Sequence, residues 1–292
     1  MIRRVWFLGL VVLGLACSTT QKLSQPAHRF KATGFKTAQP WRGDRFNNER
    51  GSFQFAIMAD RTGGNRPGIF EQGVHKLNTL RPEFVMSIGD YIEGYSENDS
   101  VLAAQWDDLL AAIAPLNMPF FCLPGNHDIS NLKMEKAWID RFGALYYHFL
   151  YDDVLFICLD TEDPPASHLS QRQIDYVLKA LQENRKVRWT MVLMHKPLYK
   201  YDNPAGFDKI EAALQDRPYT VIAGHEHRYE HQVRNGRDYY VLATTGGISK
   251  LRGPAYGEFD GIVWVTMTST GPVLANILTD GILQEEQLSG SK

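Results

Sequence analysis

Cysteine is scarce in this sequence, with only three among 292 residues. Three cysteines cannot form the network of disulfides that holds small secreted proteins together. Cys122 and Cys158 each lie within an apolar run, which predicts buried and unreactive thiols. A single disulfide between them stays open as an alternative if the two runs form neighbouring strands.

An excess of basic charge is also absent. The 31 lysine and arginine residues are balanced by 33 aspartate and glutamate residues, for a net charge of −2. Binding to nucleic acid normally requires a positively charged surface, so we expect no nucleic-acid partner. With 44% hydrophobic and 22% charged residues, the composition is that of a globular protein with a sizeable core.

The apolar run at the N-terminus, residues 5–16, is shorter than the ~20 residues that a membrane-spanning helix needs. It follows Arg3 and Arg4 and ends in a small residue before Cys17, which is the pattern of a secretory signal. The stretch Leu-Gly-Leu-Ala-Cys resembles a bacterial lipobox, with Gly14 in place of the usual aliphatic residue. We expect cleavage before Cys17, a lipid anchor to the membrane there, and a periplasmic or cell-envelope location. An uncleaved anchor is the alternative.

The rest of the chain falls into parts that differ in composition. The stretch after the signal is polar and lacks periodicity, which is typical of a partly disordered tether, although Trp41 and Phe46 could dock onto the domain. From Ser52 the pattern becomes periodic and shows no internal repeat or second domain. The predicted organisation is a signal peptide (1–16), a tether (17–50), one globular domain (51–284) and a tail (285–292).

Within the domain, predicted strands alternate with predicted helices. Strands are expected at 53–59, 83–88, 119–123, 154–159, 189–194 and 219–223, and helices at 67–80, 99–114, 132–142, 170–183 and 207–214. Hairpins are expected at 146–159, 228–243 and 262–279. This alternation predicts a layered α/β domain built on a mixed sheet.

Polar side chains of the metal-binding types follow five of these strands. They are Asp60, Asp90, Asn126 with His127, His195, and His225 with His227. A lone histidine at a strand end is more often structural, and a single Gly-Asp pair carries no information. In open α/β sheets, however, ligands bind beyond the carboxyl ends of the strands, and five coincident polar ends are hard to explain by packing alone. The sequence therefore predicts a metal site.

These motifs resemble those of the calcineurin-like metallophosphoesterases. They stand here as Asp60-Arg61-Thr62, Gly89-Asp90-Tyr91-Ile92-Glu93, Gly125-Asn126-His127-Asp128, His195 and Gly224-His225-Glu226-His227, within residues 52–280. The resemblance implies a four-layer α/β fold, with two packed mixed β-sheets flanked by helices, rather than one doubly wound sheet. It also implies two divalent metal ions and a metal-bridging hydroxide that attacks a phosphate ester.

The resemblance assigns a role to each motif residue. Asp90 would bridge both metals, Asp60 and His227 would complete site one, and Asn126, His195 and His225 would complete site two. His127 would face the leaving oxygen, as general acid or as a phosphate donor. Glu93 falls where the family has a carboxylate that orients this imidazole. The mixed ligand types suit Mn, Fe or Zn.

One departure from the family pattern concerns the first motif. Thr62 stands where the family has a histidine ligand, so site one is expected to be weaker, to bind a water in the gap, or to prefer a harder ion such as Mg or Mn. Arg61, beside it, is a candidate for binding a substrate phosphate together with Asn126 and His127, and a solvated arginine is the equally weighted alternative.

The predicted function is hydrolysis of small phosphate monoesters or diesters. A purple-acid-type phosphatase is disfavoured, because that branch needs a tyrosine ligand at the position of Glu93. The alternative from another class is a lipoprotein that binds a phosphorylated envelope ligand with little turnover, which the Thr62 departure motivates. A nuclease is disfavoured by the lack of basic charge.

Overall fold

The computed structural model describes residues 30–33, 35, 38–44, 46, 52–201 and 206–279. The predicted signal peptide, Cys17 and the predicted tail at 285–292 lie outside these residues. None of the helices in the described part of the chain combines the length and apolar character that crossing a membrane requires.

Thirteen strands and five α-helices are found in the described residues, with two short 3₁₀ helices, η1 (Leu198–Lys200) and η2 (Pro254–Tyr256). One sheet contains β2 (Trp41–Arg42), β3 (Phe53–Met58), β4 (Val85–Ser87), β5 (Phe120–Phe121), β12 (Gly261–Thr268) and β13 (Gly271–Leu278). The other contains β1 (Phe30–Lys31), β6 (Tyr147–Tyr151), β7 (Val154–Cys158), β8 (Trp189–Leu193), β9 (Tyr219–Ala223), β10 (Glu230–Arg234) and β11 (Arg237–Val241). The α-helices are α1 (Ile69–Leu80), α2 (Asp99–Ile113), α3 (Leu132–Phe142), α4 (Gln171–Glu183) and α5 (Phe207–Leu214).

Both sheets are mixed. The six-stranded sheet has the order β13-β12-β3-β4-β5-β2, with β3, β4 and β5 parallel to one another. The seven-stranded sheet has the order β1-β6-β7-β8-β9-β11-β10, with β7, β8 and β9 parallel. The carboxyl ends of β3, β4, β5, β8 and β9 carry the polar motifs, so the topology gathers the motifs from both sheets.

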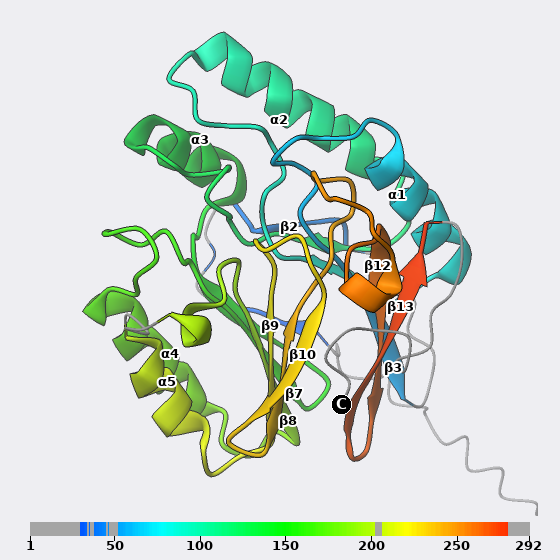
Figure 1. The fold of residues 1–292 in the computed structure, drawn as a ribbon. Coiled ribbons are helices and arrows are strands. Elements are labelled where there is room, and N and C mark those ends of the chain that lie inside the picture. Colours follow the sequence, from blue (N-terminus) through cyan, green and yellow to red (C-terminus); the bar gives the residue numbers. More distant parts are fainter. Residues whose placement is uncertain are drawn as a thin grey trace, which may run out of the picture.

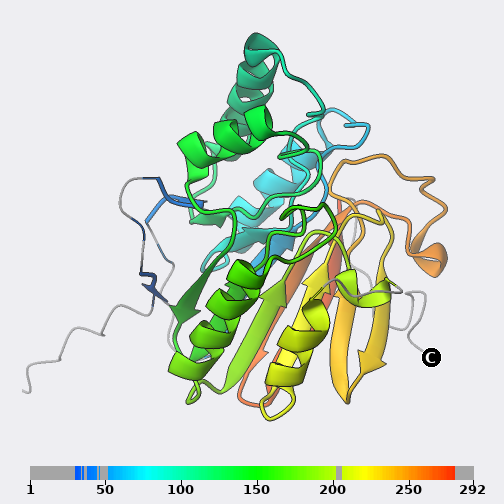
Figure 2. The same cartoon turned by 90° about the vertical axis from the view of Figure 1, so that its left-hand side faces the viewer.

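The sheets and helices form four layers (Figures 1 and 2). Helices α1, α2 and α3 pack on the outer face of the six-stranded sheet through one apolar cluster. Helices α4 and α5 lie side by side on the outer face of the seven-stranded sheet through another. Helices α2, α3 and α4 begin at Asn98, Asn131 and Ser170, whose side chains accept hydrogen bonds from amides of the first turn. The two-sheet architecture expected from the motifs is confirmed.

The core between the two sheets is rich in phenylalanine. Phe84 from the six-stranded side lies 5.9 Å from Phe149 and 5.4 Å from Phe156 of the opposite sheet, measured between ring centroids. All three rings are fully buried, and each contributes about 1.5–3 kcal/mol of apolar burial. This packing fixes the two sheets relative to each other and therefore fixes the motifs that follow their strands.

The segment assigned to a tether contains parts of the domain. Strand β1 pairs antiparallel with β6, and β2 pairs antiparallel with β5. Trp41 packs against Phe121, and Phe46 packs against Tyr151, so both aromatic residues dock as expected. The boundary at residue 50 is therefore wrong for the described residues between 30 and 46, because their backbone and rings join the sheets and the core.

Both described cysteines, Cys122 and Cys158, are free and fully buried. The prediction of buried thiols is confirmed, and the alternative of a disulfide between them is wrong. Burial raises the pKa of both thiols, that of Cys158 to about 12, which keeps it protonated and unreactive.

Candidate metal centre

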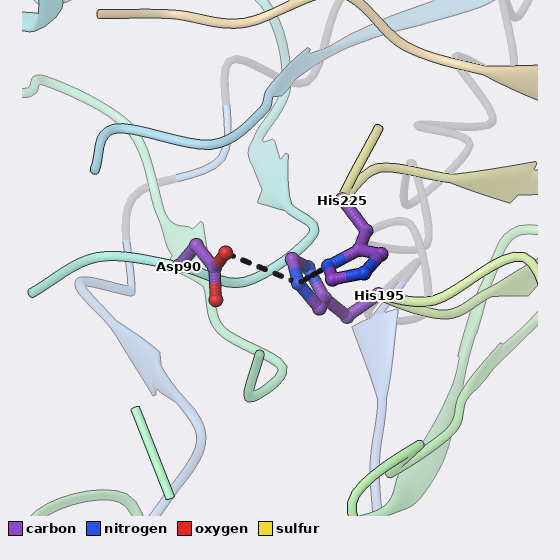
Figure 3. A group of neighbouring side chains, drawn as sticks. All are labelled: Asp90, His195 and His225. Atoms are coloured by element: carbon purple, nitrogen blue, oxygen red, sulfur yellow. Dashed lines mark hydrogen bonds and ion pairs between the residues drawn. The ribbon is translucent and has the colours of Figure 1, made fainter. Parts of the chain in front are cut away.

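The polar motifs from the two sheets meet in one place. Asp60, Asp90 and Asn126 follow β3, β4 and β5 of the six-stranded sheet, whereas His195 and His225 with His227 follow β8 and β9 of the seven-stranded sheet. Figure 3 shows Asp90, His195 and His225 in contact at this meeting point. The aspartates and His195 are fully buried, and Asn126 is nearly so.

Two sets of three side chains present atoms that could hold a metal ion. One set is Asp90, His195 and His225, and the other is Asp60, Asp90 and His227. In each set the candidate ligand atoms lie within 4.8 Å of one another, and Asp90 belongs to both sets. The Oδ1 atom of Asn126 lies 3.0 Å from Nε2 of His195, which adds an amide oxygen to the first set. The structure thus brings together all six residues that the motifs propose as ligands.

The contacts at His195 fit a cation better than a hydrogen-bond network. Its Nε2 atom lies 3.2 Å from Oδ2 of Asp90, 3.0 Å from Oδ1 of Asn126 and 3.2 Å from Nδ1 of His225. A single imidazole N–H cannot satisfy three such neighbours at once. Oδ2 of Asp60 is buried without a hydrogen-bond partner among the described residues, and an unpaired carboxylate oxygen is costly to bury. Divalent cations beside these atoms would remove both conflicts, and the donor set suits Mn, Fe or Zn.

Main-chain carbonyl groups orient two of the imidazoles. Nδ1 of His195 lies 2.8 Å from the carbonyl oxygen of Ile88, and Nδ1 of His227 lies 2.6 Å from that of Ile248. A carbonyl can only accept, so in both rings Nδ1 carries the hydrogen and Nε2 is left free to bind a metal.

Without a metal ion beside them, Asp90 and His195 favour opposite charges. Burial opposes ionisation of Asp90, but His195 outweighs it and lowers the pKa of Asp90 to about 2. Burial would also lower the pKa of His195, yet Asp90 and Asp60 raise it to about 9. Burial and the nearby His195 lower the pKa of His225 to about 3, which keeps that ring neutral. The two buried carboxylates therefore favour positive charge between them, the condition that a divalent cation meets.

The backbone is strained at four of the six candidate ligands. Asp60, Asp90, His225 and His227 have φ angles of 26°, 58°, 72° and 52°, in the left-handed region that residues with a side chain rarely adopt. Such strain is concentrated at functional sites, where surrounding structure holds it in place. Here the sharp turn after each strand directs the side chain back toward the centre.

The glycines of the motifs make room for the ligands. A Cβ atom at Gly125 would overlap Oδ1 of Asp90, and one at Gly224 would lie 2.6 Å from Oδ2 of Asp60. Neither position leaves space for a side chain while the carboxylate keeps its place. This close approach explains why glycine precedes Asn126 and His225 in the sequence.

Asp128, the last residue of the third motif, has a role that sequence analysis missed. Its Oδ2 accepts hydrogen bonds from the amides of Asp90 and Gly125, each at 2.8 Å, and its Oδ1 accepts one from the amide of Tyr91 at 2.9 Å. Asp128 therefore ties the turn after β4 to the turn after β5. In the sequence, its position directly after His127 could have indicated a role at the centre.

His127 lies at the rim of the centre. Its main-chain amide donates to Oδ1 of Asp90 at 3.0 Å, and its Nδ1 lies 2.8 Å from the carbonyl oxygen of Glu93. Its Nε2 faces Gly63, where the missing side chain leaves space between His127 and His227. The Glu93 carboxylate does not contact His127 as expected; it accepts hydrogen bonds from the amides of Gly64 and Asn65, at 3.2 and 2.7 Å. The main chain of Glu93, rather than its carboxylate, orients the imidazole.

Arg61 is not placed to bind a substrate. Its side chain is 5% exposed, donates to the carbonyl oxygen of Tyr91 at 3.1 Å and forms an ion pair with Asp108 of α2. Its guanidinium also lies 5.5 Å from the ring of Phe70. Neither the substrate-binding expectation nor the solvated alternative is correct, because these partners hold the guanidinium beneath the helices.

Thr62 is buried beside the centre. Its hydroxyl makes no hydrogen bond of normal geometry with a described residue, although it lies close enough to the Glu93 carboxylate to help lower the pKa of Glu93 against the opposing effect of burial. Its amide donates to the carbonyl oxygen of Asp90 at 3.1 Å. The position expected to hold a histidine ligand therefore lies in the turn that carries Asp60, but it offers only a hydroxyl.

Tyr95 is a further residue at the centre. Its hydroxyl accepts a hydrogen bond from Nδ2 of Asn126 at 2.9 Å, and its ring meets the ring of His127 edge to face at 4.9 Å. Because Nδ2 is engaged by Tyr95, the Oδ1 atom of Asn126 is the one that faces His195. Sequence analysis could not distinguish this tyrosine from others in loops.

Known proteins are similar to this chain in sequence and in fold. Residues 59–229 match the calcineurin-like phosphoesterase family. The chain is 26% identical over 200 residues to the 3′,5′-cyclic adenosine monophosphate phosphodiesterase CpdA of Haemophilus influenzae, covering 64% of this chain and 69% of that protein. It is 25% identical over 208 residues to tartrate-resistant acid phosphatase type 5 of Rattus norvegicus, covering 58% of this chain and 62% of the relative.

A crystal structure of a dimetal phosphatase from Danio rerio shares the fold with a TM-score of 0.64. The sequence identity is 14%, and the match covers 79% of this chain and 98% of that one. Purple acid phosphatase PPD1 from yellow lupin shares it with a TM-score of 0.61 at 16% identity, covering 81% of this chain and 53% of that one. The family match spans more than half of the chain and includes all six candidate ligands. The chain therefore belongs to the calcineurin-like phosphoesterase family and is a metallophosphoesterase.

Proposed function

We propose that this protein hydrolyses small phosphate monoesters or diesters at a centre of two divalent metal ions. The observation that carries the proposal is the pair of three-residue sets that share Asp90, each with its ligand atoms within 4.8 Å. Asp60 and His227 would hold one ion, and Asn126, His195 and His225 the other. Two cations bound in this way supply an activated water and neutralise the charge of phosphoryl oxygens.

The protein groups around the centre have separate tasks. Asp90 contributes its charge to both positions, and its low pKa keeps it ionised at neutral pH. In its doubly protonated form His127 would donate from Nε2 to a phosphoryl or leaving-group oxygen, while its Nδ1–H stays engaged by the Glu93 carbonyl group. Tyr95 can donate its own hydroxyl proton to a phosphoryl oxygen, because its oxygen already accepts from Asn126. The two donors lie together, with the rings of Tyr95 and His127 4.9 Å apart.

Hydrolysis of p-nitrophenyl phosphate and bis-p-nitrophenyl phosphate tests this proposal. The purified protein is depleted of metal with a chelator and assayed with and without added Mn²⁺. We expect turnover that depends on the metal and falls about 10²–10⁴-fold in His127→Ala, the range typical of a lost proton donor. His75→Ala, at an exposed position of α1, is the matched control and should retain wild-type turnover.

The same assay separates the alternative function. A lipoprotein that only binds a phosphorylated envelope ligand would show no metal-dependent turnover on either ester. The Thr62 departure motivates that alternative, but the contacts that hold His127 in place favour hydrolysis, because a binding protein has no need of a positioned proton donor. Absence of turnover on both esters would overturn the proposed function.

A further inference from the structure

A groove of about 720 Å³ opens directly on the metal centre, and both His225 and His227 are part of its lining. One wall is the turn after β9, which carries these histidines. The opposite wall is the segment 248–258, which Figure 2 shows in orange extending outward beyond the ends of the strands. A substrate whose phosphoryl group lies between the candidate metal ligands must place the rest of the molecule beside them, and this groove offers the space.

The wall formed by 248–258 is fixed to the centre at one end. The carbonyl oxygen of Ile248 lies 2.6 Å from Nδ1 of His227, and the amide of Ile248 donates to the carbonyl oxygen of Gly63 at 3.3 Å. Near the other end the amide of Tyr229 donates to the carbonyl oxygen of Gly257 at 2.8 Å. Within the segment, Arg252 forms a two-pronged ion pair with Glu258 and lies 4.5 Å from the ring centroid of Tyr256. The segment is therefore braced at both ends, and the groove has a defined shape.

The charges in the groove are largely neutralised, with one exception. Arg252 is paired with Glu258, and Arg228 is paired with Glu230. Glu226 is paired with Lys200, whose Nζ lies 2.6 Å from Oε2 of Glu226. Lys250 is exposed and forms no hydrogen bond or ion pair with any of the described residues, although Arg252 and, more weakly, Lys250 lower the pKa of the Glu258 carboxyl. Its ammonium group is therefore available to an anion that enters the groove.

An apolar residue, Ile248, comes two positions before Lys250 in the sequence. Ile248 is 62% exposed and lines the groove, and its carbonyl oxygen contacts His227. Along the chain, this wall thus presents first the contact with the candidate ligand His227, then the apolar side chain of Ile248 and then the ammonium group of Lys250. A complementary ligand has a phosphoryl group, an apolar linker and a second anionic group.

We propose that this groove binds the alcohol portion of the substrate, and that Lys250 selects esters whose alcohol carries a second anionic group, a carboxylate or a phosphate. This inference rests on the proposed hydrolysis of phosphate esters and adds a class of substrate to it. Ile248 provides the surface for the carbon skeleton that joins the two anionic groups. Lys250 acts only on binding, because it lies in the groove rather than among the candidate metal ligands.

The test compares phenyl phosphate with 4-carboxyphenyl phosphate and with the longer 4-(2-carboxyethyl)phenyl phosphate. For each enzyme, kcat/KM for each carboxylated ester is divided by kcat/KM for phenyl phosphate. Because the esters differ in intrinsic reactivity by the same factor for every variant, a change in this ratio between variants reports on the protein. The variants are Lys250→Gln and, as the matched control, Lys186→Gln. Lys186 is also exposed but precedes β8, at the opposite end of that strand from His195.

We expect wild type and Lys186→Gln to prefer at least one carboxylated ester. In Lys250→Gln this preference should fall about threefold to fivefold, the effect of one exposed charge pair. If phenyl phosphate is hydrolysed and neither ratio falls in Lys250→Gln, the groove proposal is overturned and the proposed function stands. An equal fall in Lys186→Gln would also overturn it, because net charge rather than the groove would then be responsible.

A readout without turnover keeps the two proposals separate. Calorimetry measures the binding of three phosphonates to the Mn²⁺-loaded protein. They are phenylphosphonate, 4-carboxyphenylphosphonate and 4-(2-carboxyethyl)phenylphosphonate. If wild type hydrolyses none of the esters but binds a carboxylated phosphonate more tightly in a manner that depends on Lys250, the hydrolytic function is overturned and the groove assignment is supported. Equal affinities for all three phosphonates would overturn the groove assignment.

Discussion

Replacement of Asp128 should both destabilise the protein and disrupt its metal centre. The Asp128 side chain is fully buried and accepts hydrogen bonds from the amides of Asp90, Tyr91 and Gly125. Asp128→Ala removes the acceptor for these three amides and for the amide of Ile92, which donates at 3.4 Å, and all four belong to buried residues. The turn after β4, which carries Asp90, would lose its connection to the turn after β5, which carries Asn126.

The magnitude follows from the number of amides left without a partner. Each buried donor that loses its acceptor costs about 1–3 kcal/mol, and water that enters the space vacated by the carboxylate recovers part of this. We therefore expect Asp128→Ala to lower the free energy of unfolding by about 4 kcal/mol. Asp128→Asn keeps one acceptor oxygen and should cost about half as much.

Two measurements check this expectation. Urea denaturation gives the free energy of unfolding, and titration with Mn²⁺ gives the metal stoichiometry of the folded protein. Asp107→Ala, at an exposed position of α2, is the matched control and should behave as wild type in both. Wild-type stability together with wild-type Mn²⁺ binding in Asp128→Ala would refute the reasoning that Asp128 holds the two turns together.

Two further predictions concern Thr62 and Asp160. Thr62→His supplies an imidazole where the chain has a neutral hydroxyl, so it should raise Mn²⁺ affinity at one of the two positions by about tenfold without abolishing turnover; an unchanged titration would contradict this. Asp160 is 2% exposed, and burial raises its pKa from 3.8 to about 8. The folded protein therefore retains a proton that the unfolded chain releases near pH 4, and the free energy of unfolding should fall between about pH 4 and 8, by at most ~1.4 kcal/mol per pH unit from this group. Asp160→Asn is neutral at every pH and should flatten this dependence in urea denaturation series, whereas a slope equal to that of wild type would show that Asp160 does not titrate as inferred.

Sequence patterns were sufficient to predict which candidate ligands the fold brings together, because each of them follows a strand at the same edge of its sheet. The strands before Asp60, Asp90 and His195 are largely apolar and contain no charged residue, as expected for strands buried on both faces. The change to a carboxylate or imidazole at the end of such a run marks the turn. Glycine beside Asn126 or His225 adds a second signal, since only a residue without a side chain fits against the carboxylates.

Roles that depend on the main chain or on distant partners could not be read in the same way. Every residue has a carbonyl group, so nothing in the sequence showed that Glu93 would orient His127 through its main chain. The partner of Arg61 is Asp108, which belongs to a helix 47 positions away, and only the packing of α2 against the sheet brings the two together. The pairing of β1 and β2 with the two sheets was missed for a similar reason, because two-residue strands are too short to show periodicity.

The two short N-terminal strands join different sheets, and this has a consequence for how the sandwich is closed. Without β1 and β2, one sheet would end at β6 and the other at β5, each with a row of unsatisfied amide and carbonyl groups beside the rings of Phe121 and Phe149. Exposed edges of this kind recruit strands from other molecules. The N-terminal segment seals both edges at once, so a chain that begins at Ser52 would tend to self-associate even with every metal ligand in place.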